Sequence, residues 1–144
     1  MFNDTISDVL TRIRNANLIK SEKVSIPFTK MSHQICQILK KQGYIKSFQI
    51  EQIEPSQINL ESSQIKSFQQ VSLNLKYKGR NKKPCITNLR RISKPGLRIY
   101  ANYKEIPKIL GGMGIIIMST SQGVMTGQEA QSRQIGGELM CSIW

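Results

Sequence analysis

The sequence predicts an α+β fold made of two small domains, and three observations support this. Residues 1–75 alternate between apolar stripes of helical period and short runs of strand period, in the order α-β-α-β-β. Residues 76–144 hold mostly strand-like runs separated by Gly and Pro, with short helices between them. The net charge of +12 is concentrated after this point, with 11 basic side chains and one acidic one from Lys76 to Lys108. We therefore expect an N-terminal α/β domain over 1–75 and a mostly-β C-terminal domain over 76–144.

The first half begins with an amphipathic helix and closes with strands. A polar residue at positions 3–5 can cap the first helix, whose apolar stripe at helical spacing consists of Ile6, Val9, Leu10 and Ile13. Residues 23–27 alternate and stop at a proline, which predicts a short edge strand. A second helix carries Met31, Ile35, Ile38 and Leu39 and should end at Gly43. Residues 44–50 and 71–77 alternate as strands, and residues 51–64 read as a connection.

The second half predicts several short strands. We expect strands at 86–89 and 97–100, with a turn at 93–96 that contains a Pro-Gly pair. About two helical turns are expected at 105–110, with Pro107 near their start. The continuous apolar run 115–118 suits a strand buried on both faces. A short helix at 128–134 and a final strand at 138–144 complete the domain.

Composition argues against several kinds of protein. The three cysteines are widely spaced and there is one histidine, His33, so neither a zinc site nor a disulfide framework is expected, and no metal or cofactor. A serine nucleophile would lack a nearby base, and the glycines at 111–114 precede a strand, whereas phosphate loops follow one. No apolar run is long enough to span a membrane, and the N-terminus resembles neither a signal nor a transit peptide. We therefore expect no enzyme, no membrane partner and no small-molecule substrate.

The stretch Ile115–Val124 is the strongest candidate for a binding site. Its apolar run leads directly into Ser119, Thr120 and Ser121, and then into Gln122 and Gly123. Short hydroxyl side chains donate and accept hydrogen bonds and let a partner come close. The plainer interpretation of this stretch is a strand followed by a polar turn.

The high positive charge favours a polyanionic partner, and its distribution favours RNA. Basic side chains would bind phosphates, and small hydroxyls and amides could reach the shallow minor groove of an RNA helix. The loop Lys78–Pro84, with Lys82 and Lys83, is the densest basic segment. Tyr100 and Tyr103 could stack on a base or pack in the core. Neither a DNA-recognition helix nor a basic amphipathic membrane helix is evident.

Several motifs resemble one known family. They are ISKPGLRIY at 92–100, IPKIL at 106–110, GMGIIIMSTSQGVMT at 112–126 and GGELMCSIW at 136–144, together with DTISDVLTRIRNAN at 4–17. In this order and spacing they resemble the bacterial and organellar branch of the small-subunit ribosomal protein number eight family. The resemblance covers nearly the whole chain apart from 51–70.

This resemblance implies the family's fold and function. The N-terminal unit would pack on the C-terminal domain, and the protein would be a structural constituent of the small ribosomal subunit that supports its assembly and translation. It would be a primary binder of a helix in the central domain of small-subunit rRNA, beside neighbouring ribosomal proteins. The main RNA contact would contain Ser119, Thr120, Ser121, Gly123, Glu138 and Tyr100. A secondary contact would contain Arg14, Asn15, Thr29 and Lys30, although from the residues alone Arg14 would lie on a solvated helix face.

Some features depart from the family or leave alternatives open. Family members commonly carry Lys where this chain has Gln122, and Gly127 and Gln128 replace an acidic and a basic residue. The basic loop could restore the lost charge. The similarity at the N-terminus, the Ile and Lys richness and the absence of a transit peptide favour a plastid (chloroplast) stroma over a bacterial cytoplasm. A free regulator of messenger RNA and a small phosphate-handling enzyme remain competing hypotheses.

Overall fold

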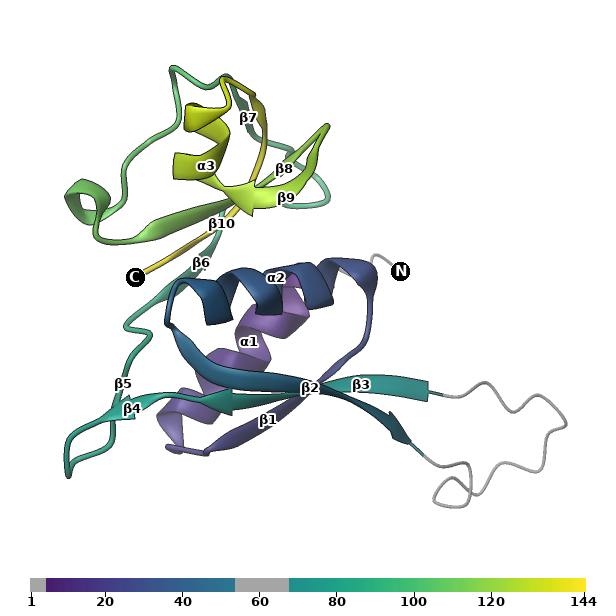
Figure 1. Cartoon of the computed structure of the whole chain (residues 1–144), viewed down its shortest axis with the longest axis vertical. Helices are drawn as coiled ribbons and strands as arrows, with labels where there is room; N and C mark the ends of the chain where they lie inside the picture. The colour runs from purple at the N-terminus through teal and green to yellow at the C-terminus, as the bar shows by residue number, and fades with distance from the viewer. Residues whose placement is uncertain (1–4, 54–67) are drawn as a thin grey trace, which may run out of the picture.

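The structure is a computed structural model that describes residues 5–53 and 68–144, and it consists of three layers (Figure 1). A three-stranded sheet forms one outer layer, helices α1 and α2 form the middle layer, and a larger sheet forms the other outer layer. All strand pairs within these sheets are antiparallel. The predicted α+β class is confirmed.

The first half follows the predicted order α-β-α-β-β. Its elements are α1 (Thr5–Leu18), β1 (Lys23–Pro27), α2 (Lys30–Lys41), β2 (Ile45–Ile53) and β3 (Phe68–Leu75). The strand order is β1-β3-β2, so β1 is an edge strand, as its proline indicated. The predicted stripe of α1 is buried, and α2 ends just before Gly43, whose φ of +80° suits glycine. Of the possible caps of α1, positions 3 and 4 lie outside the described residues. The connection predicted at 51–64 begins later than expected, because residues 51–53 continue β2 and pair with β3, and its remainder lies outside the described residues.

The second half is built around its last strand. Its elements are β4 (Tyr77–Lys78), β5 (Lys83–Pro84), β6 (Leu89–Arg91), β7 (Tyr100–Ala101), β8 (Ile115–Thr120), β9 (Gly123–Thr126), α3 (Gly127–Ser132) and β10 (Gly137–Ile143). Strand β10 pairs with β6, β7 and β8, and β9 extends the sheet beyond β8. Among the described strands, β4 and β5 pair with each other and with no other strand, as a separate hairpin. The predicted basic loop is therefore a short β-hairpin.

One hydrophobic core joins the two sheets through the helices. Its buried members come from both halves of the chain, and include Ile13 of α1, Ile35 of α2, Leu89 of β6 and Ile117 of β8. A smaller cluster around Met118 lies within the second half alone. None of the helices in the described ranges is long and apolar enough to cross a membrane. The shared core fixes the position of the second sheet relative to the first.

The prediction of a helix at 105–110 is wrong. The chain there is extended or turning, and only a single 3₁₀ turn forms, at Leu110–Gly112. Pro107 has no backbone N–H to donate, and it disfavours helical backbone at Ile106 before it. A proline is tolerated in the first turn of a long helix, but its free-energy cost is too large for a helix of only two turns.

Two predicted strands in the second half are displaced. The strand expected at 86–89 occurs at Leu89–Arg91, because the N–H groups of Thr87 and Asn88 both donate to the Trp144 carbonyl. The strand expected at 97–100 is reduced to Tyr100–Ala101. The Pro-Gly turn before it is confirmed: Lys94 and Leu97 exchange backbone hydrogen bonds of 2.9 and 3.0 Å.

Candidate nucleic-acid interface

The hairpin formed by β8 and β9 carries the predicted hydroxyl residues. Ile116, Ile117 and Met118 are buried, so β8 is covered on both faces, as its apolar run indicated. Thr120 pairs with Gly123, which leaves Ser121 and Gln122 as an exposed two-residue turn. The φ of Gly123 is +111°, a conformation that side chains with a Cβ rarely adopt. The buried strand therefore holds a small polar turn at the surface.

The three hydroxyls have different surroundings. Thr120 Oγ1 donates to the Gly123 carbonyl at 2.8 Å and accepts from the Gln122 N–H at 3.2 Å, so it closes the turn. Ser119 lies one residue earlier and therefore faces the other side of the sheet. Ser121 is exposed in the turn itself. Thr120 thus shapes the turn, while Ser121 is the hydroxyl most open to a partner.

Ser119 belongs to a row of side chains across four strands. Tyr100 of β7 is opposite Glu138 of β10, Glu138 is opposite Ser119, and Ser119 is opposite Val124 of β9. Residues directly opposite each other share a face of the sheet, with their Cβ atoms about 5 Å apart. We call these four residues the cross-strand row. The structure therefore brings three of the residues predicted for the main contact, Tyr100, Glu138 and Ser119, to adjacent positions on one face of the sheet.

A carboxylate and an aromatic ring give this row its chemistry. Tyr100 is 69% exposed, so most of its side chain is accessible to a partner. The Glu138 side chain is 17% exposed and accepts a hydrogen bond of 3.0 Å from Arg98 Nη1. The row therefore offers a hydroxyl, a carboxylate paired with a guanidinium, and a ring on which a base could stack.

Gly137 explains why β8 and β10 approach closely beside the row. A Cβ on this residue would lie 2.3 Å from the Ser119 carbonyl oxygen, far inside van der Waals contact. Any residue except glycine would push β10 away from β8 at the position where Glu138 faces Ser119. The glycine is a requirement of the site's geometry.

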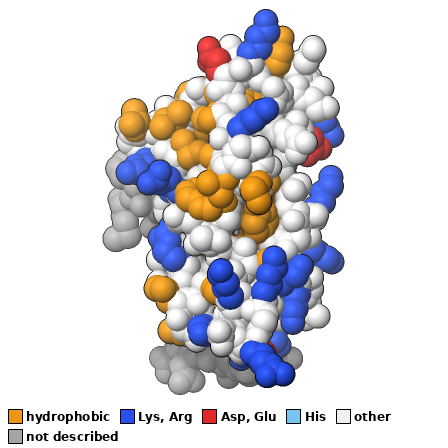
Figure 2. Space-filling view, turned by 90° about the vertical axis from the view of Figure 1, so that its left-hand side faces the viewer, with side chains coloured by type: hydrophobic (Ala, Val, Ile, Leu, Met, Phe, Trp, Pro, Cys, Tyr) orange, Lys and Arg blue, Asp and Glu red, His pale blue; other side chains and the backbone are white. Residues whose placement is uncertain are grey.

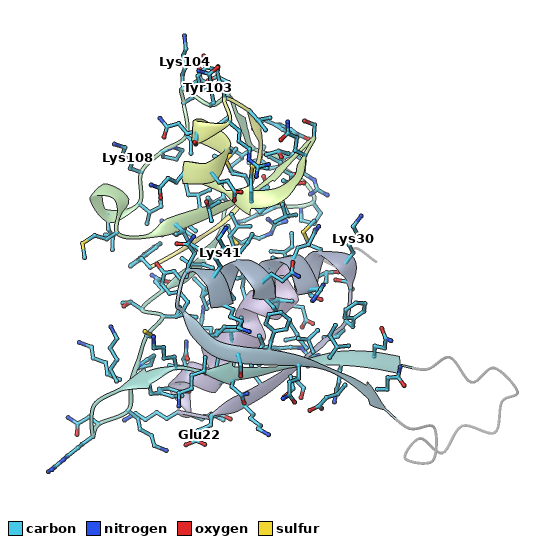
Figure 3. The ribbon with its side chains drawn as sticks, viewed as in Figure 1. Glu22, Lys30, Lys41, Tyr103, Lys104 and Lys108 are labelled. Carbon is cyan, nitrogen blue, oxygen red and sulfur yellow. The ribbon has the colours of Figure 1, made fainter. Side chains whose placement is uncertain are left out.

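The four residues predicted for a secondary contact lie on the two helices. Thr29 is the N-cap of α2: its Oγ1 accepts from the Ser32 N–H at 3.0 Å, and Ser32 Oγ accepts from the Thr29 N–H at 2.8 Å. Lys30 follows at the exposed start of α2 (Figure 3). This end of α2 is on the same side of the molecule as the turn of the β8–β9 hairpin (Figures 1 and 3).

On α1, Asn15 is exposed, while Arg14 already has a partner within the chain. The Arg14 guanidinium donates to the carbonyl of Leu89, at the edge of β6. It therefore ties α1 to the second sheet, a role that its sequence position did not indicate. Arg12, on the same helix, pairs with Asp8 at 3.1 Å and donates to the Ser25 carbonyl.

Lys82 and Lys83 do not lie beside the hydroxyl residues. They belong to the β4–β5 hairpin, where Lys82 Nζ is 3.7 Å from a carboxylate oxygen of Glu22. Glu22 lies at the lower end of the molecule, whereas the β8–β9 turn is at its upper right (Figures 1 and 3). Figure 2 shows the face carrying β4 and β5, where Lys and Arg crowd the lower half and hydrophobic side chains occupy the centre. This hairpin is a separate basic surface and does not restore charge at the turn.

Sequence reasoning missed two arginines beside the predicted site. Arg98 pairs with Glu138, and Arg133 donates to Glu129 Oε1 at 3.0 Å and to Gln122 Oε1 at 3.3 Å. The spacing of Glu129 and Arg133 on a helix was a usable signal for their pair. The contact with Gln122 depends on how α3 folds back along β9, and nothing in the local sequence indicates it.

No cluster of three or more His, Cys, Asp or Glu side chains suited to a metal occurs within the described ranges. Burial raises the pKa of the Cys36 and Cys141 thiols to about 12, so neither is a nucleophile near neutral pH.

Comparison with known proteins gives a consistent result. A family model described as ribosomal protein S8 matches residues 4–144. The chain is 58% identical over 144 residues to the small ribosomal subunit protein uS8c of Oltmannsiellopsis viridis, and 51% identical over 146 residues to that of Chlorella vulgaris. It is 51% identical over 144 residues to the protein of the same name from Marchantia polymorpha. Each alignment covers the whole of both chains.

Proposed function

The chain belongs to the ribosomal protein S8 family, and on this basis we propose that it binds a helix in the central domain of small-subunit rRNA through its β8–β9 hairpin. Membership makes it a structural protein of the small ribosomal subunit and not an enzyme, with rRNA and neighbouring ribosomal proteins as partners. The relatives named uS8c support a plastid ribosome as its location, and we propose the stroma as its compartment.

The observation that carries this proposal is the cross-strand row beside an exposed polar turn. Tyr100, Glu138 and Ser119 face one side at adjacent positions on β7, β10 and β8, and Ser121 projects from the turn next to them. Such a surface offers stacking and hydrogen bonding to base edges and 2′-hydroxyls in a wide, shallow groove. We assign the main contact to Ser119, Thr120, Ser121, Gly123, Glu138 and Tyr100, with Thr120 and Gly123 acting by holding the turn.

Two further surfaces would add affinity. Asn15, Thr29 and Lys30, together with Arg14, form the proposed secondary contact. Lys82 and Lys83 would bind phosphates on a third surface, through an attraction that salt weakens. We retain the division of the chain into units 1–75 and 76–144, with the secondary contact on the first unit and the main contact on the second.

A salt-dependent competition tests this function. Purified protein is titrated with a central-domain rRNA hairpin against excess random duplex RNA, from low to high salt. A preference for the hairpin that persists as salt rises is expected, because hydrogen bonds to a defined groove are less sensitive to salt than phosphate contacts. Equal binding to both RNAs that vanishes with salt would overturn the proposal.

A serine pair sharpens the test. Ser121→Ala should weaken hairpin binding by about 1–3 kcal/mol, the usual cost of leaving a buried polar partner unsatisfied, and should leave random RNA unaffected. Ser25→Ala, which removes an exposed serine of β1 in the other sheet, is the matched control and should bind as the wild type does. Unchanged hairpin affinity in Ser121→Ala would remove this hydroxyl from the contact.

A further inference from the structure

The side chain of Arg133 lies at the turn of the β8–β9 hairpin. Its Nη1 donates to Gln122 Oε1 at 3.3 Å and its Nη2 donates to Glu129 Oε1 at 3.0 Å. The side chain remains 50% exposed. Two anchors on different elements therefore hold a solvent-accessible guanidinium next to Ser121 and Gln122, the residues that form the turn.

The fold explains how a residue 11 positions after Gln122 returns to it. Thr126 ends β9 and caps α3, its Oγ1 accepting from the Glu129 N–H at 3.2 Å, so the helix begins without a connecting loop. Helix α3 packs against both β8 and β9. Arg133 is its C-cap residue, and its N–H bonds to the Glu129 carbonyl at 3.0 Å. The end of a short helix is thus fixed against the turn.

The hairpin otherwise lacks positive charge. No Lys or Arg occurs between Ile115 and Gln128, so the turn offers hydroxyls and amides but no group that attracts phosphate over a distance. A guanidinium has five N–H donors in a planar fork, and the hydrogen bonds to Gln122 and Glu129 occupy two of them. The others can form the paired hydrogen bonds that suit a phosphate diester.

We propose that Arg133 binds a backbone phosphate of the RNA held by the β8–β9 hairpin, and that Gln122 and Glu129 position its guanidinium. This inference rests on the proposed function and names the group that fixes the RNA backbone beside the turn. The Glu129 carboxylate does not prevent it, because an exposed ion pair contributes little net energy and mainly limits the orientations of the side chain. The phosphate becomes a further acceptor on the outer edge of the same guanidinium.

Four variants separate charge from positioning. Arg133→Ala should weaken binding to the central-domain hairpin about tenfold and flatten its salt slope by about 0.7–0.9, the change for one lost phosphate contact. Arg133→Lys should keep the slope and lose part of the affinity, because it keeps the charge without the fork. Gln122→Ala should weaken binding less than Arg133→Ala and leave the slope unchanged. Glu129→Gln should behave like Gln122→Ala.

Two control variants test for the effect of losing a positive charge elsewhere and of losing an ion pair on a helix. Lys46→Ala removes one exposed positive charge from β2, on the other sheet, and should leave hairpin affinity unchanged within error. Arg12→Ala removes an equivalent pair with an acidic residue four positions earlier on a helix, and should match Arg133→Ala in thermal stability. If Arg133→Ala fails to fold, Arg133→Gln is measured in its place.

The outcomes distinguish this inference from the proposed function. If the wild type prefers the hairpin while Arg133→Ala keeps its affinity and salt slope, Arg133 does not bind phosphate and the proposed function still stands. A loss no greater than that of Lys46→Ala would also overturn the inference. If the wild type itself shows no preference for the hairpin, the proposed function fails, and the inference fails with it.

Discussion

The molecule presents two β-hairpins at opposite ends, and they differ in almost every physical respect. The β8–β9 hairpin continues from a strand buried on both faces, and its turn is closed by the Thr120 hydroxyl. The β4–β5 hairpin has strands of two residues each and carries exposed Lys82 and Lys83, and it pairs with no other strand in the part of the chain that the structure describes. The β8–β9 hairpin is held in a larger sheet and carries little charge, whereas the β4–β5 hairpin carries charge and is not part of a larger sheet. Charge alone would have favoured the β4–β5 hairpin, at the opposite end of the molecule from the proposed main contact.

Truncating a buried side chain of β8 should have the largest effect on stability. Ile117 is fully buried in the core that joins both sheets, so Ile117→Ala should lower the free energy of unfolding by about 2–5 kcal/mol. Urea denaturation measures this change. Lys78→Ala, at an exposed position of the other hairpin, should alter stability by less than about 0.5 kcal/mol, as surface substitutions usually do. Equal losses at both positions would mean that the two hairpins are supported alike.

Adding one methyl group at Gly137 should be the next largest change. Its Cβ would meet the Ser119 carbonyl oxygen, so Gly137→Ala should destabilise the fold by about 1–3 kcal/mol and disturb the cross-strand row. Thermal unfolding and hairpin-RNA affinity should both fall. Gly96→Ala is the matched control, because a Cβ at Gly96 would meet nothing within 4 Å. A neutral Gly137→Ala would show that β8 and β10 can separate freely.

The Thr120 hydroxyl should have a smaller effect on stability. Thr120→Val keeps the shape of the side chain but loses the hydrogen bonds to the Gly123 carbonyl and the Gln122 N–H, which should cost about 1 kcal/mol. Specific RNA binding should weaken as the turn loosens, while random RNA binding stays constant. Denaturation and filter binding measure the two effects, with Thr87→Val as an exposed control. A stable variant with weakened hairpin binding would instead indicate direct contact by the hydroxyl.

Neutralising the basic hairpin should barely change stability. The Lys82–Glu22 pair is exposed, so replacing Lys82 and Lys83 by Ala should change unfolding by less than about 1 kcal/mol. Binding of all RNAs should weaken, and the salt slope should flatten by about 0.7–0.9 per lost phosphate contact. A slope as steep as that of the wild type would show that this hairpin does not touch phosphate.

Thiol labelling should distinguish the partly exposed cysteine beside the β4–β5 hairpin from the two buried cysteines, without any substitution. At pH 9 an alkylating reagent should modify the partly exposed Cys85, just after β5, and spare Cys36 and Cys141. Their pKa is raised to about 12 by burial, so both remain protonated and inaccessible in the folded state. Mass spectrometry should find one modified thiol in native protein and three after denaturation. Native modification of Cys141 would mean that β10 opens readily.

The sequence predicts well those elements whose side chains repeat with a clear period. The stripe containing Ile6 and Ile13 is buried, and the apolar run 115–118 forms the expected doubly covered strand. Prediction fails where backbone hydrogen bonds decide the outcome. The strand expected at 86–89 is displaced because Thr87 and Asn88 bond to Trp144, and the helix expected at 105–110 is prevented by Pro107.

The candidate site shows the same division. Ser119 and Tyr100 were already candidates from the residues themselves, and Glu138 was added by resemblance to a family. The strand register then places the three side by side. Their contact with RNA stays a prediction. Arg14 and Arg133 illustrate what a linear sequence hides, because their partners Leu89 and Gln122 lie on other elements. Long-range contacts of charged side chains follow from packing, which no local pattern encodes.

The core that runs through both sheets has a consequence for how the contacts would cooperate. Because Ile13, Ile35 and Ile117 belong to one packed cluster, the start of α2 and the β8–β9 turn are held at a fixed separation. If both bind RNA as proposed, binding at one would present the other to its own target at a high effective concentration, with little further loss of rotational freedom. The reverse also follows: an RNA whose two target segments are not yet spaced correctly can engage only one contact. The protein would therefore bind most tightly to RNA whose two target segments are already at the matching distance.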